Sequence, residues 1–191
     1  QLSDEAIDTI CAAFPEDSEV QFQAALQILY RNPDLCAEKA AALLAKAPKN
    51  PCLYALQALA NQAEPEIAAE AMEKALEIWP DEPDWHAIAG ALYEQQERYD
   101  LAAQHLEEAL RIQPKQAHYW QMLGDIKVLE KDYHAARDYF SKAIELFPDN
   151  AEALSALAVI NQQLGEYQAA IACLKQAEQL DPENKFYAQQ I

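Results

Sequence analysis

The side chains that could catalyse a reaction or bind a metal are few and widely spaced in this chain. No two cysteines have the CxxC spacing, no two histidines have the spacing of metal ligands, and the HExxH, GxGxxG and P-loop patterns are absent. A chain of 191 residues does not need disulfides to fold, so we expect reduced thiols. We therefore predict no enzymatic activity, no cofactor and no metal site. The residues considered are His86, His105, His118, His134, Cys11, Cys36, Cys52 and Cys173.

The charge of the chain is strongly negative, because 32 Asp and Glu residues against 14 Lys and Arg residues give a formal net charge of −18. Nucleic acids and anionic membrane surfaces both attract clustered basic residues, and this chain has no such cluster. The acidity contributes to solubility and would favour a basic partner. No run of 18 apolar residues and no signal peptide are found, so we expect a cytoplasmic protein without membrane insertion. Because the chain begins with Gln1 rather than Met, we also expect a segment of a longer protein.

The elements that position these residues are expected to be helices. Ala, Leu, Glu and Gln are abundant, and the chain contains only three glycines. Prolines recur at equal intervals along the chain, each just after a helical stretch, as in IELFPDN at residues 144–150. Proline ends a helix because it lacks an N–H and clashes with the preceding turn. The pattern predicts a repeat with two helices per unit, whose joints lie at Pro80, Pro114, Pro148 and Pro182.

When the repeats are aligned on the prolines, similar residues also recur at several other positions, which we call columns. In residues 119–150 these columns hold Trp120, Leu123, Gly124, Tyr133, Ala136, Phe140, Ala143 and Pro148. A 34-residue unit with these residues resembles the tetratricopeptide repeat (TPR) family, strongly over residues 83–184 and more weakly upstream. The resemblance implies an all-α fold, a right-handed α-α superhelix (a TPR solenoid) of antiparallel helix pairs.

The same register divides the chain into segments. We expect the repeat at 51–82 to be two residues short, in the turn between its helices, where Pro65 replaces the tyrosine. The N-terminal segment is predicted to hold a lone second helix over residues 3–14, and the C-terminal one to start a further or capping helix. The segments are 1–17 (partial repeat), 18–50 (degenerate repeat), 51–82 (shortened repeat), 83–116, 117–150 and 151–184 (regular repeats) and 185–191 (further helix).

Some packing follows from these columns. The small residue at Gly124 is expected to let the second helix of its pair approach closely. His86 falls in the tryptophan column and is predicted to be a core residue. Lys127 stands where other repeats have an aromatic, and its stem is expected to lie along the apolar surface with the charge in water. Phe147 is expected on the buried side of the joint before Pro148.

The face of each first helix that points away from its own core is the candidate functional surface. At 100° per residue, the second, sixth, ninth and thirteenth residues of each repeat point that way, and the resemblance implies that they line a concave groove. Large apolar residues recur at the sixth position, where a solvent-facing surface should be polar. The candidate groove residues are Leu56, Leu59, Asp84, Ile88, Ala91, His118, Met122, Asp125, Leu129, Glu152 and Val159.

Two interpretations of the apolar stripe formed by Leu56, Ile88 and Met122 stay open. Neighbouring first helices, or a terminal helix folded back into the groove, could cover it. Alternatively, it binds an apolar peptide or helix. In that case the nearby acidic residues would favour Lys or Arg beside the apolar anchors of the partner.

The resemblance also implies a test for one class of partner. TPR co-chaperones hold the acidic tails of heat-shock proteins with a clamp of Lys, Asn and Arg in three successive first helices. No clamp residue is found here, so we exclude that class. The corresponding positions are Ala87, Ala91, Met122, Glu152 and Ala156.

We predict a protein–protein interaction module, an adaptor or scaffold that binds a protein or peptide partner through this groove. One alternative is a scaffold or self-assembly arm of a larger multidomain protein, in which open solenoid ends pair into a homo-oligomer. Another is a secretion-type chaperone that shields an apolar peptide of its client.

Overall fold

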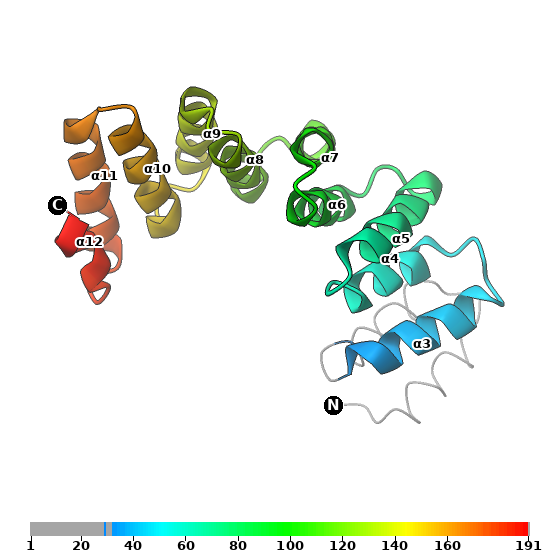
Figure 1. Ribbon diagram of the computed structural model, residues 1–191. Helices are drawn as coiled ribbons and strands as arrows, with labels where there is room; N and C mark the ends of the chain where they lie inside the picture. The colour runs from blue at the N-terminus through cyan, green and yellow to red at the C-terminus, as the bar shows by residue number, and fades with distance from the viewer. Residues whose placement is uncertain (1–28, 30–31, 191) are drawn as a thin grey trace. The chain divides into compact units, whose positions relative to one another are not determined.

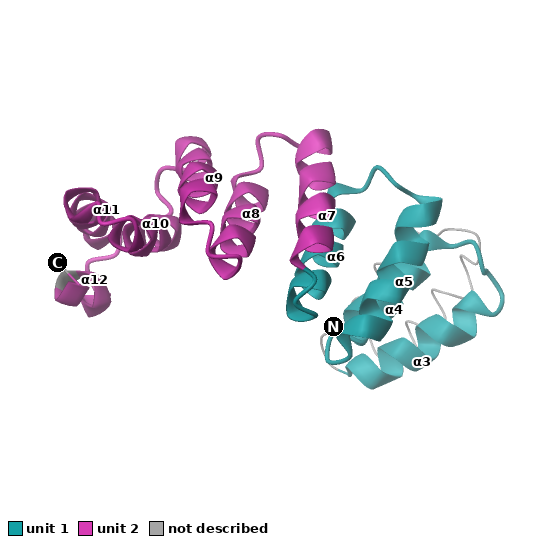
Figure 2. Ribbon diagram, turned by 45° about the horizontal axis from the view of Figure 1, so that its top comes forward, with its two compact units in different colours: residues 1–98 teal, residues 99–191 magenta. Residues whose placement is uncertain are grey.

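The structure, a computed structural model, describes residue 29 and residues 32–190 (Figure 1). Every regular element in these residues is an α-helix, as expected for an all-α chain. The helix predicted over residues 3–14 lies outside the described part. The chain divides into two units, residues 1–98 and 99–191 (Figure 2), which are described separately. The division falls inside segment 83–116, which reads as one repeat in the sequence.

The described helices of unit 1 all begin with proline. Proline is favoured in the first turn because its missing N–H would have no intrahelical partner there and its φ is already helical. Asn32 and Asn50 cap two of these helices, since their side-chain oxygens accept hydrogen bonds from Leu35 N and Cys52 N. The helices are α3 (Pro33–Leu44), α4 (Pro51–Ala60), α5 (Pro65–Ile78) and α6 (Pro83–Gln95).

The shortened repeat differs from the expectation in where the residues are missing. Helix α4 has 10 residues, whereas α6 has 13, and the linker 61–64 after α4 is one residue longer than the linker 96–98 after α6. The deletion therefore lies at the C-terminal end of the first helix, and the turn is slightly lengthened rather than shortened. Pro65 can begin α5 because the N–H of the first helical residue has no intrahelical partner.

Unit 2 is a succession of helix pairs. The cores of neighbouring pairs are continuous, because α10 packs on both α9 and α11. One cluster contains Ala136, Phe140, Ala153 and Ile160, and the next contains Leu154, Ala158, Leu174 and Tyr187. The helices are α7 (Tyr99–Ile112), α8 (Ala117–Leu129), α9 (Tyr133–Leu146), α10 (Ala151–Gln163), α11 (Tyr167–Leu180) and α12 (Lys185–Gln190).

The close approach expected at Gly124 is confirmed. A Cβ atom built on Gly124 would lie 2.6 Å from two ring carbons of Phe140, which is shorter than any normal carbon contact. Phe140 is fully buried on α9, so its ring cannot swing into solvent. The glycine therefore lets the backbone of α8 lie directly against this ring.

The proline joints have a feature that the sequence columns did not predict. The side chain six residues after the proline reaches back to its carbonyl oxygen: Tyr54 Oη lies 3.2 Å from that of Pro48, His86 Nε2 2.9 Å from that of Pro80, and Trp120 Nε1 3.0 Å from that of Pro114. Three different side chains thus satisfy the same backbone acceptor at the joint. His86 is buried, as predicted for a core residue.

The expectation for Phe147 is wrong, because its side chain is 53% exposed. Helix α9 ends at Leu146, and Phe147 has φ −138° and ψ 85°, outside the helical region. Its side chain therefore no longer follows the buried stripe of α9.

The turns between the two helices of a pair share a left-handed residue. Glu97, Lys131 and Gly165, which occupy the same column in successive repeats, have φ values of 58°, 62° and 78°. In each case the next N–H bonds to a carbonyl five residues back, as Asp132 N does to Lys127 O at 2.9 Å. This is the Schellman helix end, where glycine is preferred because a Cβ is strained at positive φ. Only Gly165 has the residue type that marks such a position in a sequence.

We expect Lys131→Gly to raise the free energy of unfolding by about 0.5–1 kcal/mol. Relief of left-handed strain is worth about 1–2 kcal/mol, and the extra chain entropy of glycine in the unfolded state offsets part of it. Gly165→Ala, at the same position one repeat later, should lower the free energy of unfolding. Urea unfolding followed by circular dichroism measures both. Destabilisation by Lys131→Gly would contradict this account of the turn.

Candidate functional site

The described residues contain no group of side chains with evident catalytic chemistry. No cluster of His, Cys, Asp or Glu among them is placed to hold a metal ion. Of the described cysteines, Cys36 and Cys52 are buried and Cys173 is half-buried, and Cys11 lies outside the described part. Burial raises the pKa of Cys36 to about 11 and also raises the pKa of Cys173. These two thiols therefore stay protonated near neutral pH, which makes them poor nucleophiles.

In unit 1 the candidate groove residues lie on α4 and α6, and they differ in exposure. Leu56 is fully buried in a cluster with Cys36, Ala40 and Leu53, so the expectation that it faces a groove is wrong. The physical reason is that Cys36 and Ala40 of α3 pack onto this face of α4. Of the other candidates, Leu59, Ile88 and Ala91 are half-buried and Asp84 is exposed.

In unit 2 the candidates lie on α8 and α10, and the apolar ones are more open. Leu129 exposes 45% of its surface and Val159 exposes 48%. Of the others, Met122 and Asp125 are half-buried, and His118 and Glu152 are exposed. The open apolar residues are thus at the ninth and thirteenth positions of their repeats, and the sixth position holds the half-buried Met122.

Helices α8 and α10 turn this face outward because their other faces are in the core. Leu123 and Ile126 of α8 are buried, as are Leu154 and Ile160 of α10. A hydrogen bond of 3.0 Å from Asn150 Nδ2 to Gln121 Oε1 links the start of α10 to the middle of α8. The same asparagine caps α10, so one side chain sets both the start of α10 and its link to α8.

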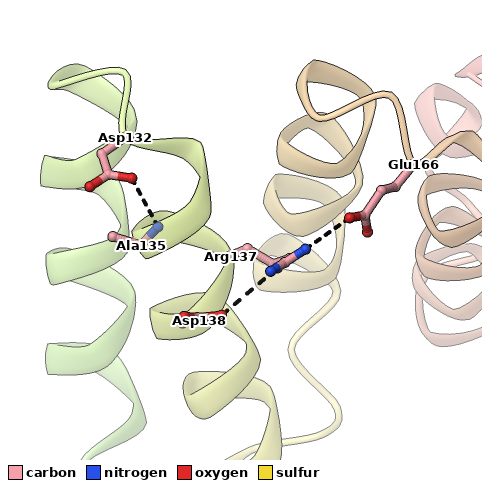
Figure 3. A network of polar contacts seen from close by, with 5 residues as sticks. All are labelled: Asp132, Ala135, Arg137, Asp138 and Glu166. Carbon is pink, nitrogen blue, oxygen red and sulfur yellow. Dashed lines mark hydrogen bonds and ion pairs between the residues drawn. The ribbon is translucent and has the colours of Figure 1, made fainter.

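A second polar link holds the second helices of unit 2 (Figure 3). A guanidinium nitrogen of Arg137 on α9 lies 2.9 Å from Glu166 Oε1, just before α11. Arg137 also lies 3.8 Å from Asp138, and Asp132 caps α9 by accepting from Ala135 N. These groups are partly exposed, so the ion pair contributes only about 0.2–1 kcal/mol. It links α9 to the residue just before α11.

The charge beside the exposed face of unit 2 is largely negative. Lys127 is paired with Glu130 at 2.7 Å, and the hydrogen bond to that carboxylate raises the pKa of the lysine. The ammonium group is therefore held at Glu130, an ion pair that the expectation of a charge in water did not include. Asp125 and Glu152 remain on the candidate face itself.

One residue of this face is not among the candidates predicted from the sequence. Phe186 of α12 lies one repeat length after Glu152 and is 48% exposed. The signal was available, because continuing the repeat register past Pro182 places Phe186 in the second position of the next repeat. Residues 185–191 were assigned to a further helix without assigning its columns.

None of the helices in the described residues has the length and apolar character required to cross a membrane.

Two family models match the chain, and both describe tetratricopeptide repeats. One matches residues 55–117 and the other residues 127–190, so together they match more than half of the chain. No curated protein matches the chain.

Solved structures with the same fold have low sequence identity to the chain. YrrB, a TPR protein with an unusual peptide-binding site, is 17% identical with a TM-score of 0.78, and 98% of each chain is covered. MamA (41-end) from Desulfovibrio magneticus RS-1 is 17% identical with a TM-score of 0.79, over 88% of this chain and 97% of that one. PilF of Pseudomonas aeruginosa is 23% identical with a TM-score of 0.77, over 96% of this chain and 82% of that one. These likenesses confirm the predicted fold, a TPR solenoid of helix pairs.

Proposed function

Because the chain belongs to the tetratricopeptide repeat family, whose members bind protein or peptide partners, we propose that unit 2 binds an apolar peptide through the exposed face of α8 and α10. The observation that carries this proposal is the exposure of the apolar side chains of Leu129 and Val159 on this face. The peptide-binding site of YrrB, a protein of the same fold, is consistent with it.

The proposed site differs from the stripe derived from the sequence. Leu56 is in the core, and Ile88 on unit 1 is half-buried, so neither is included. Leu129 and Val159 provide the open apolar surface on unit 2, and the half-buried Met122 lies on α8 about two turns before Leu129. Asp125 and Glu152 lie beside these residues and favour a Lys or Arg in the partner.

The size of this surface limits the affinity. Burying a large apolar side chain contributes about 1.5–3 kcal/mol, and association costs at least about 4 kcal/mol. Three such side chains and a charge contact therefore support binding on the order of micromolar, about −8 kcal/mol, at best. A module with this affinity suits reversible association.

A random peptide library displayed on phage tests the proposal. We expect the wild-type chain to select peptides rich in Leu, Ile or Phe with neighbouring Lys or Arg. Leu129→Asp combined with Val159→Asp should lower the affinity for a selected peptide by at least about tenfold, or about 1.4 kcal/mol, in fluorescence anisotropy. Both side chains are exposed, so circular dichroism should show an unchanged fold.

The matched control is Tyr167→Asp, which places the same charge on an exposed aromatic at the start of α11, a second helix. This variant should bind as the wild type does. Selection of acidic peptides, or equal affinity for the double variant and the wild type, would show that this face does not bind the peptide.

A further inference from the structure

Helix α5 of unit 1, the second helix of its pair, exposes two large apolar side chains on one line along its surface. Ile67 is 47% exposed and Ile78 is 43% exposed. They lie eleven residues apart on one continuous helix, and a turn of 100° per residue brings Ile78 to within about 20° of Ile67. Met72 and Leu76, on the opposite face of α5, are buried. The line of the two isoleucines is therefore the outward side of this helix.

The neighbours of α5 hold it in this orientation. Helix α5 packs on both α4 and α6. Tyr93 Oη of α6 donates a hydrogen bond to Glu73 Oε1 at 2.8 Å, and Gln96 Nε2 donates to the carbonyl oxygen of Pro65 at 2.9 Å. These two bonds tie the middle and the start of α5 to the helix that follows it, so the outward side of α5 has a fixed direction within unit 1.

An aromatic side chain extends the apolar surface at the end of α5. Trp79 follows Ile78 directly and is 45% exposed. Its ring lies edge-to-face on that of Trp85, with a centroid distance of 5.6 Å and an interplanar angle of 81°. Trp85 is buried on α6, so it positions the exposed ring of Trp79 at the joint.

The charge around this apolar line is strongly negative. Residues 64–84 contain eight Asp and Glu residues and a single basic residue, Lys74. Lys74 lies 2.7 Å from Glu70, with which it forms an ion pair on the outward side of α5, and Glu77 is also exposed there. Apolar side chains among carboxylates fit a partner that is both apolar and basic. A second copy of this chain fits poorly, because it brings the same formal net charge of −18.

The corresponding helix of the last repeat, α11, lacks this combination. Leu180 occupies the column of Ile78 and is 41% exposed, but the column of Ile67 holds Ala169. The helix itself carries one Lys and one Glu, whose charges balance. Helix α11 therefore has one apolar side chain at the matching position, without the second one and without the acidity.

The spacing of the two isoleucines indicates the conformation of the ligand. At a rise of about 1.5 Å per residue, eleven residues of α5 span about 16 Å along the helix axis. A ligand helix that lies along α5 also returns to the same face after eleven residues, so its residues i and i+11 face the two isoleucines. An extended chain needs about five residues to span this distance, and an odd number places the two side chains on opposite faces.

We propose that unit 1 has a docking surface of its own, formed by Ile67, Ile78 and Trp79, which binds a basic amphipathic helix of a partner protein. The ligand helix has apolar residues at i and i+11 and Lys or Arg between them, opposite the carboxylates of α5. This surface lies on a second helix and in the other unit, so the inference does not depend on the proposed function of unit 2.

A designed helical peptide tests this docking surface. The probe has sixteen residues, with Leu at positions 3 and 14, Lys at 6, 7, 10 and 11 and Ala elsewhere, a composition that favours helix. The pattern is the same in both directions, so the probe fits either orientation along α5. We expect it to bind the full chain with a dissociation constant on the order of 0.1 mM in fluorescence anisotropy. Ile67→Ser combined with Ile78→Ser should weaken binding by at least about tenfold. Circular dichroism should show unchanged helix content, because serine and isoleucine have similar helix propensities.

The controls separate the apolar line from general charge attraction. Phe147→Ser combined with Leu180→Ser removes exposed apolar side chains from the columns of Trp79 and Ile78 in unit 2, and it should leave probe binding unchanged. A peptide of the same composition with Leu at positions 3 and 12 has its two leucines on opposite faces and should bind at least about fivefold more weakly. A probe with Glu in place of Lys should bind at least about tenfold more weakly.

Three outcomes would overturn the inference. They are no binding of the probe at about 1 mM, equal binding of the two Lys peptides, and equal binding of the wild type and the double isoleucine variant. Because the unit 2 residues Leu129 and Val159 are not altered in these experiments, such results would leave the proposed function to the library experiment.

Discussion

Gly124→Ala is expected to lower the free energy of unfolding by about 1–2 kcal/mol. Alanine normally stabilises a helix relative to glycine by about 1 kcal/mol. Here the added methyl would lie 2.6 Å from ring carbons of Phe140, and overpacking of a core typically costs about 1–3 kcal/mol. The clash outweighs the propensity gain because Phe140 is fully buried and its ring has no free space to enter. Urea unfolding followed by circular dichroism measures the change.

A double-mutant cycle separates the two contributions. Phe140→Ala alone should cost about 3–5 kcal/mol, as for other buried phenylalanines. In that background Gly124→Ala should become stabilising by about 1 kcal/mol, because the clash is gone and the helix propensity remains. If Gly124→Ala has the same sign in both backgrounds, the ring of Phe140 is not what requires the glycine.

Asn161→Leu is expected to raise the free energy of unfolding by about 1–3 kcal/mol. Asn161 is buried on α10, its amide nitrogen makes only a 3.8 Å contact with Cys173 Sγ, and no donor in the described residues reaches its Oδ1. A buried acceptor without a partner carries this order of desolvation cost, and leucine of similar volume removes it. The denaturation midpoint and hydrogen exchange of the α10 and α11 amides should both show greater protection.

Asn150 provides the matched control at the start of the same helix. Its side-chain oxygen accepts from Ala153 N, and its nitrogen donates to Gln121, so both polar atoms are used. Asn150→Leu should therefore destabilise the chain by about 0.5–2 kcal/mol through loss of the cap. If both asparagine variants change the free energy of unfolding in the same direction, burial alone, rather than hydrogen bonding, decides the change in stability.

Much of the fold could be predicted from the sequence because the relevant signals are local. The prolines and the helix-forming composition indicated the helices of residues 83–184, and the small residue at Gly124 indicated the close approach to Phe140. The turn residues were harder to find, since Glu97 and Lys131 adopt positive φ without being glycine. Their positive φ depends on the hydrogen bonds at the helix end. These bonds cannot be read from the residue types Glu and Lys at these positions.

The candidate site was predicted less well because exposure depends on which helix packs over a given face. Leu56 fits the apolar pattern of a groove, yet α3 covers it. Leu129 and Val159 are exposed, whereas Met122 in the sixth column is half-buried. Phe186 belonged to the same register but lay beyond the last proline, where the columns were not continued.

The sequence by itself determined the helical class, the repeat length and the face of each first helix, because helix propensity, proline geometry and the turn of about 100° per residue act over a few residues. Only the tertiary structure decided which apolar residues on that face remain open. That outcome depends on packing between helices, such as that of α3 on α4 in the cluster that contains Cys36 and Leu56. Those contacts bury one end of the apolar stripe and leave Leu129, Val159 and Phe186 accessible on unit 2.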